Sequence, residues 1–132
     1  MTPEQKETLI QEWISAQEAW DKNENSDNLH WAIEKLIHLP EEDPESTWDV
    51  ILGILEKDPS DKIIDILAAS PLEDLMTYHG EKYINHIEDE IKHNTRLKKC
   101  MRGVWLDSKD TPVWKKFYEL AEIEPPFPEK NA

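Results

Sequence analysis

Apolar residues recur along this chain at the spacing of α-helices. In the first segment they stand four, three and four residues apart, which gathers them on one face of a helix. These residues are Leu9, Trp13, Ala16 and Trp20. Before them, Thr2 and Gln5 have the spacing of a capping box around a proline at the first helical position. We therefore expect a first helix that ends near Lys22.

Seven more apolar stripes follow, and proline or cap residues separate them. We expect Pro40 to end the second helix. Ser70 and Glu73 have capping-box spacing and open a fifth helix, which Gly80 ends in the left-handed conformation. The other expected boundaries are Asp58-Pro59 for the end of the third helix, a Ser60 cap for the fourth, roughly Glu81 to His93 for the sixth, Thr95 to Arg102 for the seventh, and Thr111-Pro112 for the start of the eighth. Strand signals are sparse. The predicted fold is all-α, with about eight short helices in a compact orthogonal bundle or a short helical-repeat-like stack.

Length and residue types predict the domain organisation and the compartment. Residues 1–124 are expected to form a single helical domain, since 132 residues is close to the commonest domain size. Three prolines exclude helix from Pro125 onward, so residues 125–132 are expected to be a tail. Cys100 is the only cysteine, which excludes an internal disulfide and favours a reducing compartment. Without a signal-peptide pattern or a membrane-spanning apolar run, we expect a cytoplasmic protein with no membrane partner.

Charge is the most informative bulk property of the chain. It has 15 basic and 29 acidic residues, for a net charge of −14. Residues 1–90 carry 6 basic and 23 acidic side chains, whereas residues 91–132 carry 9 and 6. An acidic surface repels nucleic acid and attracts cationic partners from a distance. The simpler alternative is that the acidity only keeps the protein soluble.

One stretch of the chain carries a recognisable pattern. Residues 67–76 read Leu-Ala-Ala-Ser-Pro-Leu-Glu-Asp-Leu-Met, and His79-Gly80 and Gly103-Val104-Trp105 follow. The arrangement resembles a family of small uncharacterised bacterial helical proteins with L-A-A-G-P-L-E-D-L-L, a nearby H-G and a later G-V-W. Here Ser70 replaces the glycine and Met76 the second leucine. The resemblance implies a helical fold and a bacterial or phage source, and it brings no activity with it.

The polar residues of that pattern are Glu73, Asp74 and His79. Two carboxylates and an imidazole are groups that could share a proton or hold a divalent metal, which is the basis of an alternative prediction, a metal-dependent enzyme. Each residue also has a local structural explanation. Glu73 would complete the capping box, Asp74 would favour the positive end of the helix, and His79 would lie in its last turn. We therefore predict no catalytic residue, no metal and no cofactor.

Two other candidates for chemistry have simpler explanations. His79, His86 and His93 recur every seven residues, about 10.5 Å apart along a helix, which is too far for one metal ion. His86 and Glu90 would form only a two-ligand pair, and they lie opposite the apolar stripe of that helix, on the face expected to meet solvent. Cys100 stands among cations that would make a thiol reactive, but it also continues an apolar stripe, so we expect it in the core.

A basic stretch supports a second alternative, a regulator that binds nucleic acid. It has no acidic residue between Glu90 and Asp107, and it could contact phosphate. Its members are Lys92, Arg96, Lys98, Lys99 and Arg102. The net charge around it and the absence of a reader motif make nucleic acid an unlikely partner. Pairing with the protein's own acidic surface is the simpler expectation.

The preferred hypothesis is a non-enzymatic acidic module that binds a cationic protein. Trp31 departs from the apolar stripe of its helix, so it is expected to be exposed and to anchor an interface. We place the binding patch at the acidic link between the second and third helices, with Trp31 nearby. The link residues are Glu41, Glu42, Asp43 and Glu45. An immunity protein or inhibitor that covers the positive cleft of a nuclease-like target would suit such a patch. We expect a monomer or weak dimer.

Overall fold

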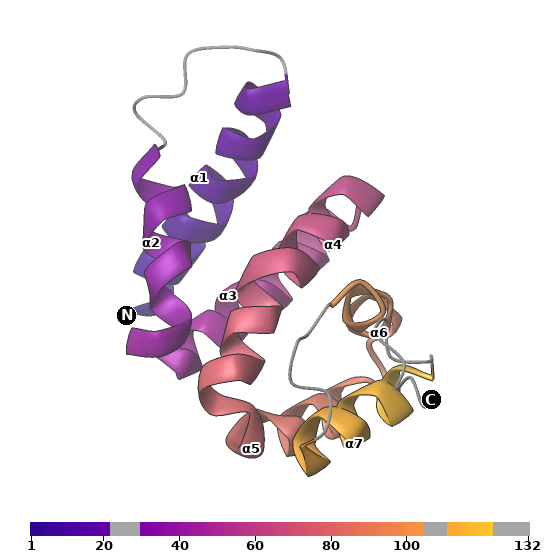
Figure 1. The fold of residues 1–132 in the computed structure, drawn as a ribbon. Helices are drawn as coiled ribbons and strands as arrows, with labels where there is room; N and C mark the ends of the chain where they lie inside the picture. The colour runs from indigo at the N-terminus through magenta and orange to yellow at the C-terminus, as the bar shows by residue number, and fades with distance from the viewer. Residues whose placement is uncertain (22–29, 105–110, 123–132) are drawn as a thin grey trace.

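The computed structural model describes residues 1–21, 30–104 and 111–122, without the side chains of Trp20 and Asp21. Helix dominates these residues and they contain no strand, so the all-α prediction is confirmed. The elements are α1 (Pro3–Asp21), α2 (His30–Glu42), α3 (Pro44–Lys57), α4 (Asp61–Leu67), the π-helical turn η2 (Ala68–Leu72), α5 (Glu73–Glu90), α6 (Thr95–Met101) and α7 (Pro112–Ala121) (Figure 1). The expected end of the first helix near Lys22, the Trp105 of the family pattern and the expected tail at 125–132 lie outside the described residues.

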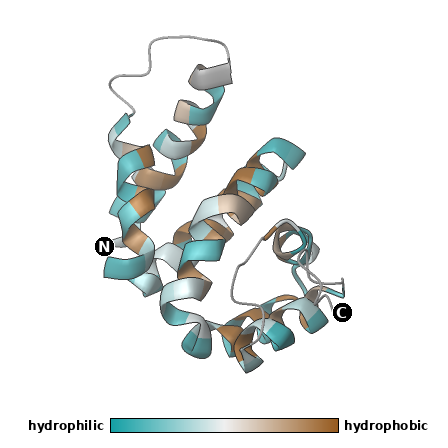
Figure 2. Cartoon of the chain, viewed as in Figure 1, coloured by the Kyte–Doolittle hydropathy of each residue, from teal (hydrophilic) through white to brown (hydrophobic). Residues whose placement is uncertain are grey.

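The helices surround one cluster of buried side chains, to which every element contributes. α1 packs against α2 and α3, and α2 packs against α5. α6 and α7 pack together on the other side of the segment formed by α4 and α5 (Figure 1). The hydrophobic faces of the helices turn toward their neighbours (Figure 2). The predicted arrangement of the helices, a bundle or a repeat-like stack, stays a prediction.

Several predicted caps are confirmed, and all of them are local in sequence. The Thr2 amide donates to Gln5 Oε1 at 2.8 Å, and the Gln5 amide donates to Thr2 Oγ1 at 3.1 Å. Ser60 caps α4 by accepting from the Ile63 amide, and Thr111 caps α7. Pro112 occupies the first turn of α7, where its missing N–H costs nothing.

The described residues form six continuous helical segments rather than eight, because α4, η2 and α5 join into one. Ser70 is therefore not a helix cap, contrary to the prediction. It lies inside the π-helical turn, and its hydroxyl is 3.4 Å from Asp74 Oδ2. Pro71 is buried in the same turn. A proline ring clashes with the carbonyl four residues earlier in a regular α-helix, and the wider π turn gives it room.

Gly80 does not end a helix either. The backbone kinks at His79, with φ −137° and ψ 30°, and α5 continues through the kink to Glu90. Gly80 is buried, and a Cβ atom added there would lie 3.0 Å from a methyl group of Val113 in α7. The glycine thus allows α7 to approach α5 closely. A left-handed cap was the wrong prediction, since no glycine in the described residues has a positive φ.

Contrary to our expectation, Pro40 does not end α2. The acidic link is not a loop. α2 continues to Glu42 with Pro40 buried, and the Asp43 amide donates to Leu39 O at 2.8 Å. Proline removes only one helical hydrogen bond here, in the last turn. α3 begins one residue later, with Asp43 as its N-cap.

Candidate protein-binding surface

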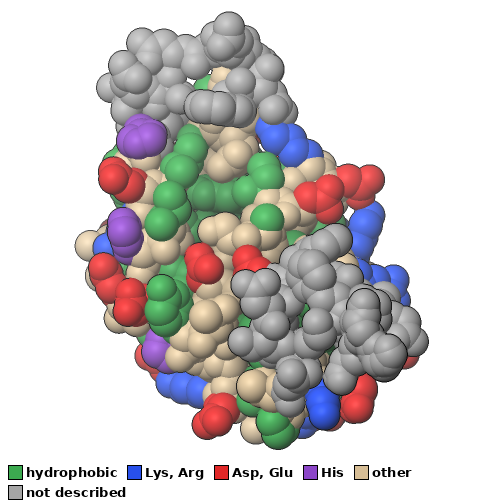
Figure 3. All heavy atoms as spheres, viewed as in Figure 1, with side chains coloured by type: hydrophobic (Ala, Val, Ile, Leu, Met, Phe, Trp, Pro, Cys, Tyr) green, Lys and Arg blue, Asp and Glu red, His purple; other side chains and the backbone are tan. Residues whose placement is uncertain are grey.

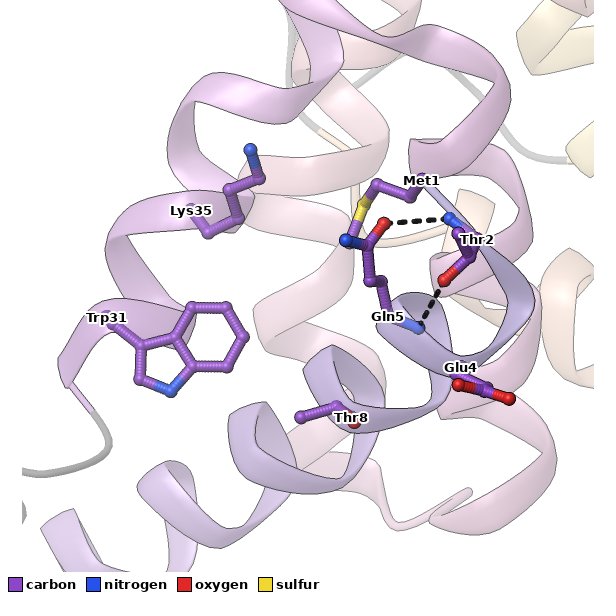
Figure 4. Close-up of a pocket in the computed structure, with 7 residues that line it drawn as sticks. All are labelled: Met1, Thr2, Glu4, Gln5, Thr8, Trp31 and Lys35. Carbon is purple, nitrogen blue, oxygen red and sulfur yellow. Dashed lines mark hydrogen bonds between the residues drawn. The ribbon is translucent and has the colours of Figure 1, made fainter.

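A hollow of about 560 Å³ lies where the first turn of α2 faces the N-terminal turns of α1 (Figure 4). We call it the Trp31 hollow. Its lining residues are Met1, Thr2, Glu4, Gln5, Thr8, Trp31 and Lys35. Trp31 is 40% exposed, as its position off the apolar stripe predicted. Neither Glu4 nor Lys35 has an ion pair within the part of the chain that the structure describes, so one charge of each sign remains available beside the indole.

The Trp31 side chain is held in place although it is exposed. Its indole Nε1 donates a hydrogen bond of 2.7 Å to Glu12 Oε1 on α1. In Figure 4 the nitrogen points away from the hollow and the six-membered ring faces the side of Gln5 and Lys35. An aromatic ring that is already oriented loses little conformational entropy when a partner covers it. The arrangement is therefore suited to anchoring an interface.

The four acidic link residues, Glu41, Glu42, Asp43 and Glu45, form what we call the acidic junction between α2 and α3. Glu41, Glu42 and Glu45 are exposed. Figure 3 shows carboxylates, with histidines among them, along the edge of the molecule where α2 lies. Trp31 is at the opposite end of α2, ten residues and therefore about 15 Å from Glu41. Along α2, Trp31 and the acidic junction are therefore not neighbours, contrary to the expectation.

One residue, Met1, nevertheless takes part in both the Trp31 hollow and the acidic junction. Met1 lines the hollow, and its amino group lies 3.6 Å from Asp43 Oδ2. Asp43 has a structural task, since it accepts hydrogen bonds from the Ser46 hydroxyl at 2.7 Å and the Ser46 amide at 3.1 Å. The hydrogen bond from that hydroxyl, more than any other contact, lowers the pKa of the Asp43 carboxyl. Of the four junction residues, Asp43 is committed to the fold.

The structure does not bring Glu73, Asp74 and His79 together as a site. Asp74 faces Ser70 one turn earlier, and burial raises the pKa of its carboxyl, which the Ser70 hydrogen bond partly offsets. His79 lies at the kink inside α5 rather than in a last turn, with Nε2 3.3 Å from Glu41 O. Among the residues at 1–21, 30–104 and 111–122, no three His, Cys, Asp or Glu side chains are grouped so that they could hold a metal ion.

The basic stretch is paired within the chain. This agrees with the simpler expectation, that it pairs with the protein's own acidic surface. Arg96 donates to the Leu55 and Glu56 carbonyls at the end of α3, and Arg102 donates to Ala121 O. The side-chain pairs are Lys92 with Asp89 at 3.6 Å, Lys98 with Glu122 at 2.6 Å and Lys99 with Asp61 at 2.5 Å. Lys92, Lys98 and Lys99 therefore already have carboxylate partners within the chain, and Arg96 and Arg102 already contact backbone carbonyls.

Cys100 is in the core, so the prediction of a buried thiol is confirmed. The residue has no exposed surface. Burial raises the pKa of its thiol to about 12, with a smaller contribution from Asp65. A thiol in this environment stays protonated and unreactive.

The sequence interpretation missed a cluster of rings from Trp48, Tyr83 and His86. The His86 ring lies 4.8 Å from Tyr83 and 6.1 Å from Trp48, measured between centroids. His86 is exposed, as expected for the outer face of its helix, and Trp48 is half-buried. The three-residue spacing of Tyr83 and His86 could have indicated their contact. Nothing in the sequence placed Trp48 of α3 beside them.

The chain belongs to a protein family of unknown function, DUF6869, which it matches over residues 19–123. This agrees with the predicted membership of an uncharacterised helical family, while the particular sequence pattern and the bacterial or phage source stay predictions. Searches of curated proteins and of solved structures find no match. None of the helices within the described residues has both the length and the apolar character needed to cross a membrane.

Proposed function

We propose that this protein is a non-enzymatic binding module that docks a cationic protein through the Trp31 hollow and the acidic junction. The observation that carries the proposal is the Trp31 indole, which is 40% exposed and yet fixed by its hydrogen bond to Glu12. Interface hot spots are enriched in tryptophan, and a ring fixed before binding is the kind of anchor that they use.

The charge around the hollow supports a cationic partner. Residues 1–21 and 30–57 carry three lysines against twelve Asp and Glu side chains. Two of those lysines, Lys6 and Lys57, are already paired with Asp49 and Glu7. The remaining carboxylates produce a negative field that speeds the encounter with a positive surface, whereas the buried contact comes from Trp31.

A nuclease-like protein with a positive nucleic-acid cleft is the partner class that this chemistry suits best. A chain that covers such a cleft with carboxylates would act as an immunity protein or inhibitor. The two alternatives have less support. Ion pairs within the chain engage several cations of the basic stretch, and Asp74 and His79 of the family pattern contact different groups, Ser70 and Glu41.

The test compares two charge reversals of equal size. The first variant is Glu41→Lys with Glu42→Lys and Glu45→Lys, which leaves the Asp43 cap intact. The control changes three exposed carboxylates elsewhere to lysine, namely Asp65, Glu81 and Glu119. The partner is captured from the source organism and purified, and association rates are measured at low salt. We expect the junction variant to lose at least about tenfold in association rate relative to the control. Equal rates for the two variants would reject this surface.

The Trp31 anchor is tested separately. Trp31→Ala should weaken partner binding by about tenfold or more, mainly through faster dissociation. Tyr78→Ala removes a comparably exposed ring from α5 and serves as the control. If both substitutions weaken binding equally, the Trp31 hollow is not the anchor.

A further inference from the structure

A second hollow, of about 340 Å³, is formed by residues of α1, α3 and α5. We call it the Trp48 hollow. It is lined by Lys6, Glu45, Trp48, Asp49, Tyr83 and His86. Trp48 and His86 also line a neighbouring hollow of about 290 Å³. A volume near the lower limit for ligand pockets fits one side chain better than a whole cofactor.

The walls of the Trp48 hollow are aromatic. The Trp48 and His86 rings are inclined at 75°, and the Tyr83 and His86 rings at 34°. A flat group that lies on the face of one of the two nearly perpendicular rings would meet the edge of the other. Ring faces carry partial negative charge and attract cations, tryptophan most strongly.

The rim of the hollow is negative. Lys6 Nζ forms a 2.6 Å ion pair with Asp49, and this contact, followed by the charges of Asp43 and Glu45, raises the pKa of the lysine. The pKa of the Tyr83 hydroxyl is raised by burial first and then by the same three carboxylates. One ammonium therefore stands among three carboxylates. Glu45 itself has no ion pair within residues 1–21, 30–104 and 111–122.

We propose that the Trp48 hollow receives an arginine side chain of the protein partner, with the guanidinium stacked on the face of the Trp48 ring, against the edge of His86, and hydrogen-bonded to Glu45. The inference rests on the proposed function, because it assumes a cationic partner, and it adds the side-chain chemistry that is recognised. Glu45 also belongs to the acidic junction, so the two surfaces are continuous.

Arginine fits these surroundings better than lysine for geometric reasons. The guanidinium is planar, stacks on aromatic rings and presents paired N–H donors to a carboxylate. A lysine ammonium is compact and strongly hydrated, so it gains less from a ring face. Lys6 already supplies an ammonium to Asp49, and Lys82 Nζ lies 5.6 Å from the centroid of the Tyr83 ring, which leaves Glu45 and the Trp48 and His86 rings for a group of different shape.

The experiment uses two synthetic peptides of equal length and charge, one alternating arginine with glycine and the other lysine with glycine. Each is titrated into the full chain at low salt by isothermal calorimetry. The arginine peptide should bind about threefold more tightly than the lysine peptide. His86→Ala and Glu45→Gln alter exposed side chains, and each should reduce this preference toward unity. Lys6→Ala removes the competing ammonium and should raise affinity for the arginine peptide about threefold.

The outcomes separate this inference from the proposed function. Equal binding of the two peptides, unchanged in His86→Ala, overturns the arginine site and leaves the acidic docking surface standing. No binding of either peptide also overturns the arginine site. The proposed function fails independently if the captured partner binds the junction variant and its control equally. Trp31→Ala should leave the arginine preference intact. Loss of the preference in that variant would show that arginine binds at the Trp31 hollow and not at the Trp48 hollow.

Discussion

Helices α1 to α3 and helices α6 and α7 use their charged side chains in opposite ways. The C-terminal pair has more cations than carboxylates, and its arginines and lysines contact carbonyls or carboxylates of the same chain. The N-terminal three have eleven carboxylates against three lysines, and most of these carboxylates face solvent. Charge in the C-terminal pair joins helices to one another. In α1 to α3, Glu7, Glu12 and Asp49 also have partners within the chain. The junction glutamates Glu41, Glu42 and Glu45 have no ion pair within the described residues, which makes them available to another molecule.

The largest expected effect is a loss of folding stability at alkaline pH, and it tests the C-terminal region. The buried thiol and phenol of that region titrate there, whereas carboxylates do not. The pKa of the Cys100 thiol is about 12 in the folded protein and near 9 when exposed. The unfolded chain therefore releases this proton first, and stability that is complete below about pH 9 falls by about 1.4 kcal/mol per pH unit above it. Tyr118, whose hydroxyl donates to Val104 O and whose pKa is also about 12, adds to the loss.

Urea unfolding measured from about pH 8 to about pH 11 checks this slope. Cys100→Ala lowers stability near pH 8 but should flatten the pH dependence, since it removes the titrating thiol. If the variant and the unmodified protein keep the same slope, the thiol is not buried in the way that the core packing indicates.

The next effect compares a cation from each region. Arg96 donates to two carbonyls at the end of α3, so Arg96→Ala should cost about 1–2 kcal/mol of unfolding free energy. Lys35 lines the Trp31 hollow and has no ion pair within the described part of the chain, so Lys35→Ala should change stability by less than about 0.5 kcal/mol. Denaturant unfolding of both variants makes the measurement. Equal costs would remove the contrast between the two regions.

The smallest effect lies inside the acidic junction. Asp43 caps α3, so Asp43→Ala should cost about 1 kcal/mol. Its neighbour Glu42 is exposed, and Glu42→Ala should be neutral within about 0.5 kcal/mol. Because the pKa of Asp43 is lowered in the fold, its contribution should disappear as the pH falls below the ordinary value of 3.8. Thermal melts of the two variants at neutral and acid pH test both statements, and an Asp43→Ala variant as stable as Glu42→Ala would contradict the capping role.

Sequence reasoning succeeded where the cause of a structure lies within a few residues. The Thr2, Ser60 and Thr111 caps were predictable because each side chain meets an amide three residues later. It failed at Pro40, Ser70 and Gly80, where turn residues lie inside helices. At Gly80 the reason is a contact with a distant residue, the close approach of Val113.

The sequence by itself determined that this chain is helical and acidic, that Cys100 belongs to the core and that Trp31 leaves the apolar face of its helix. These properties follow from periodicity and composition, which are fixed before folding. Only the tertiary structure decided that Glu12, nineteen residues earlier, holds the Trp31 indole, and that Trp48 meets His86 across two helices. Such contacts depend on how helices pack, and side-chain spacing within one helix carries no information about which face of another helix it will meet.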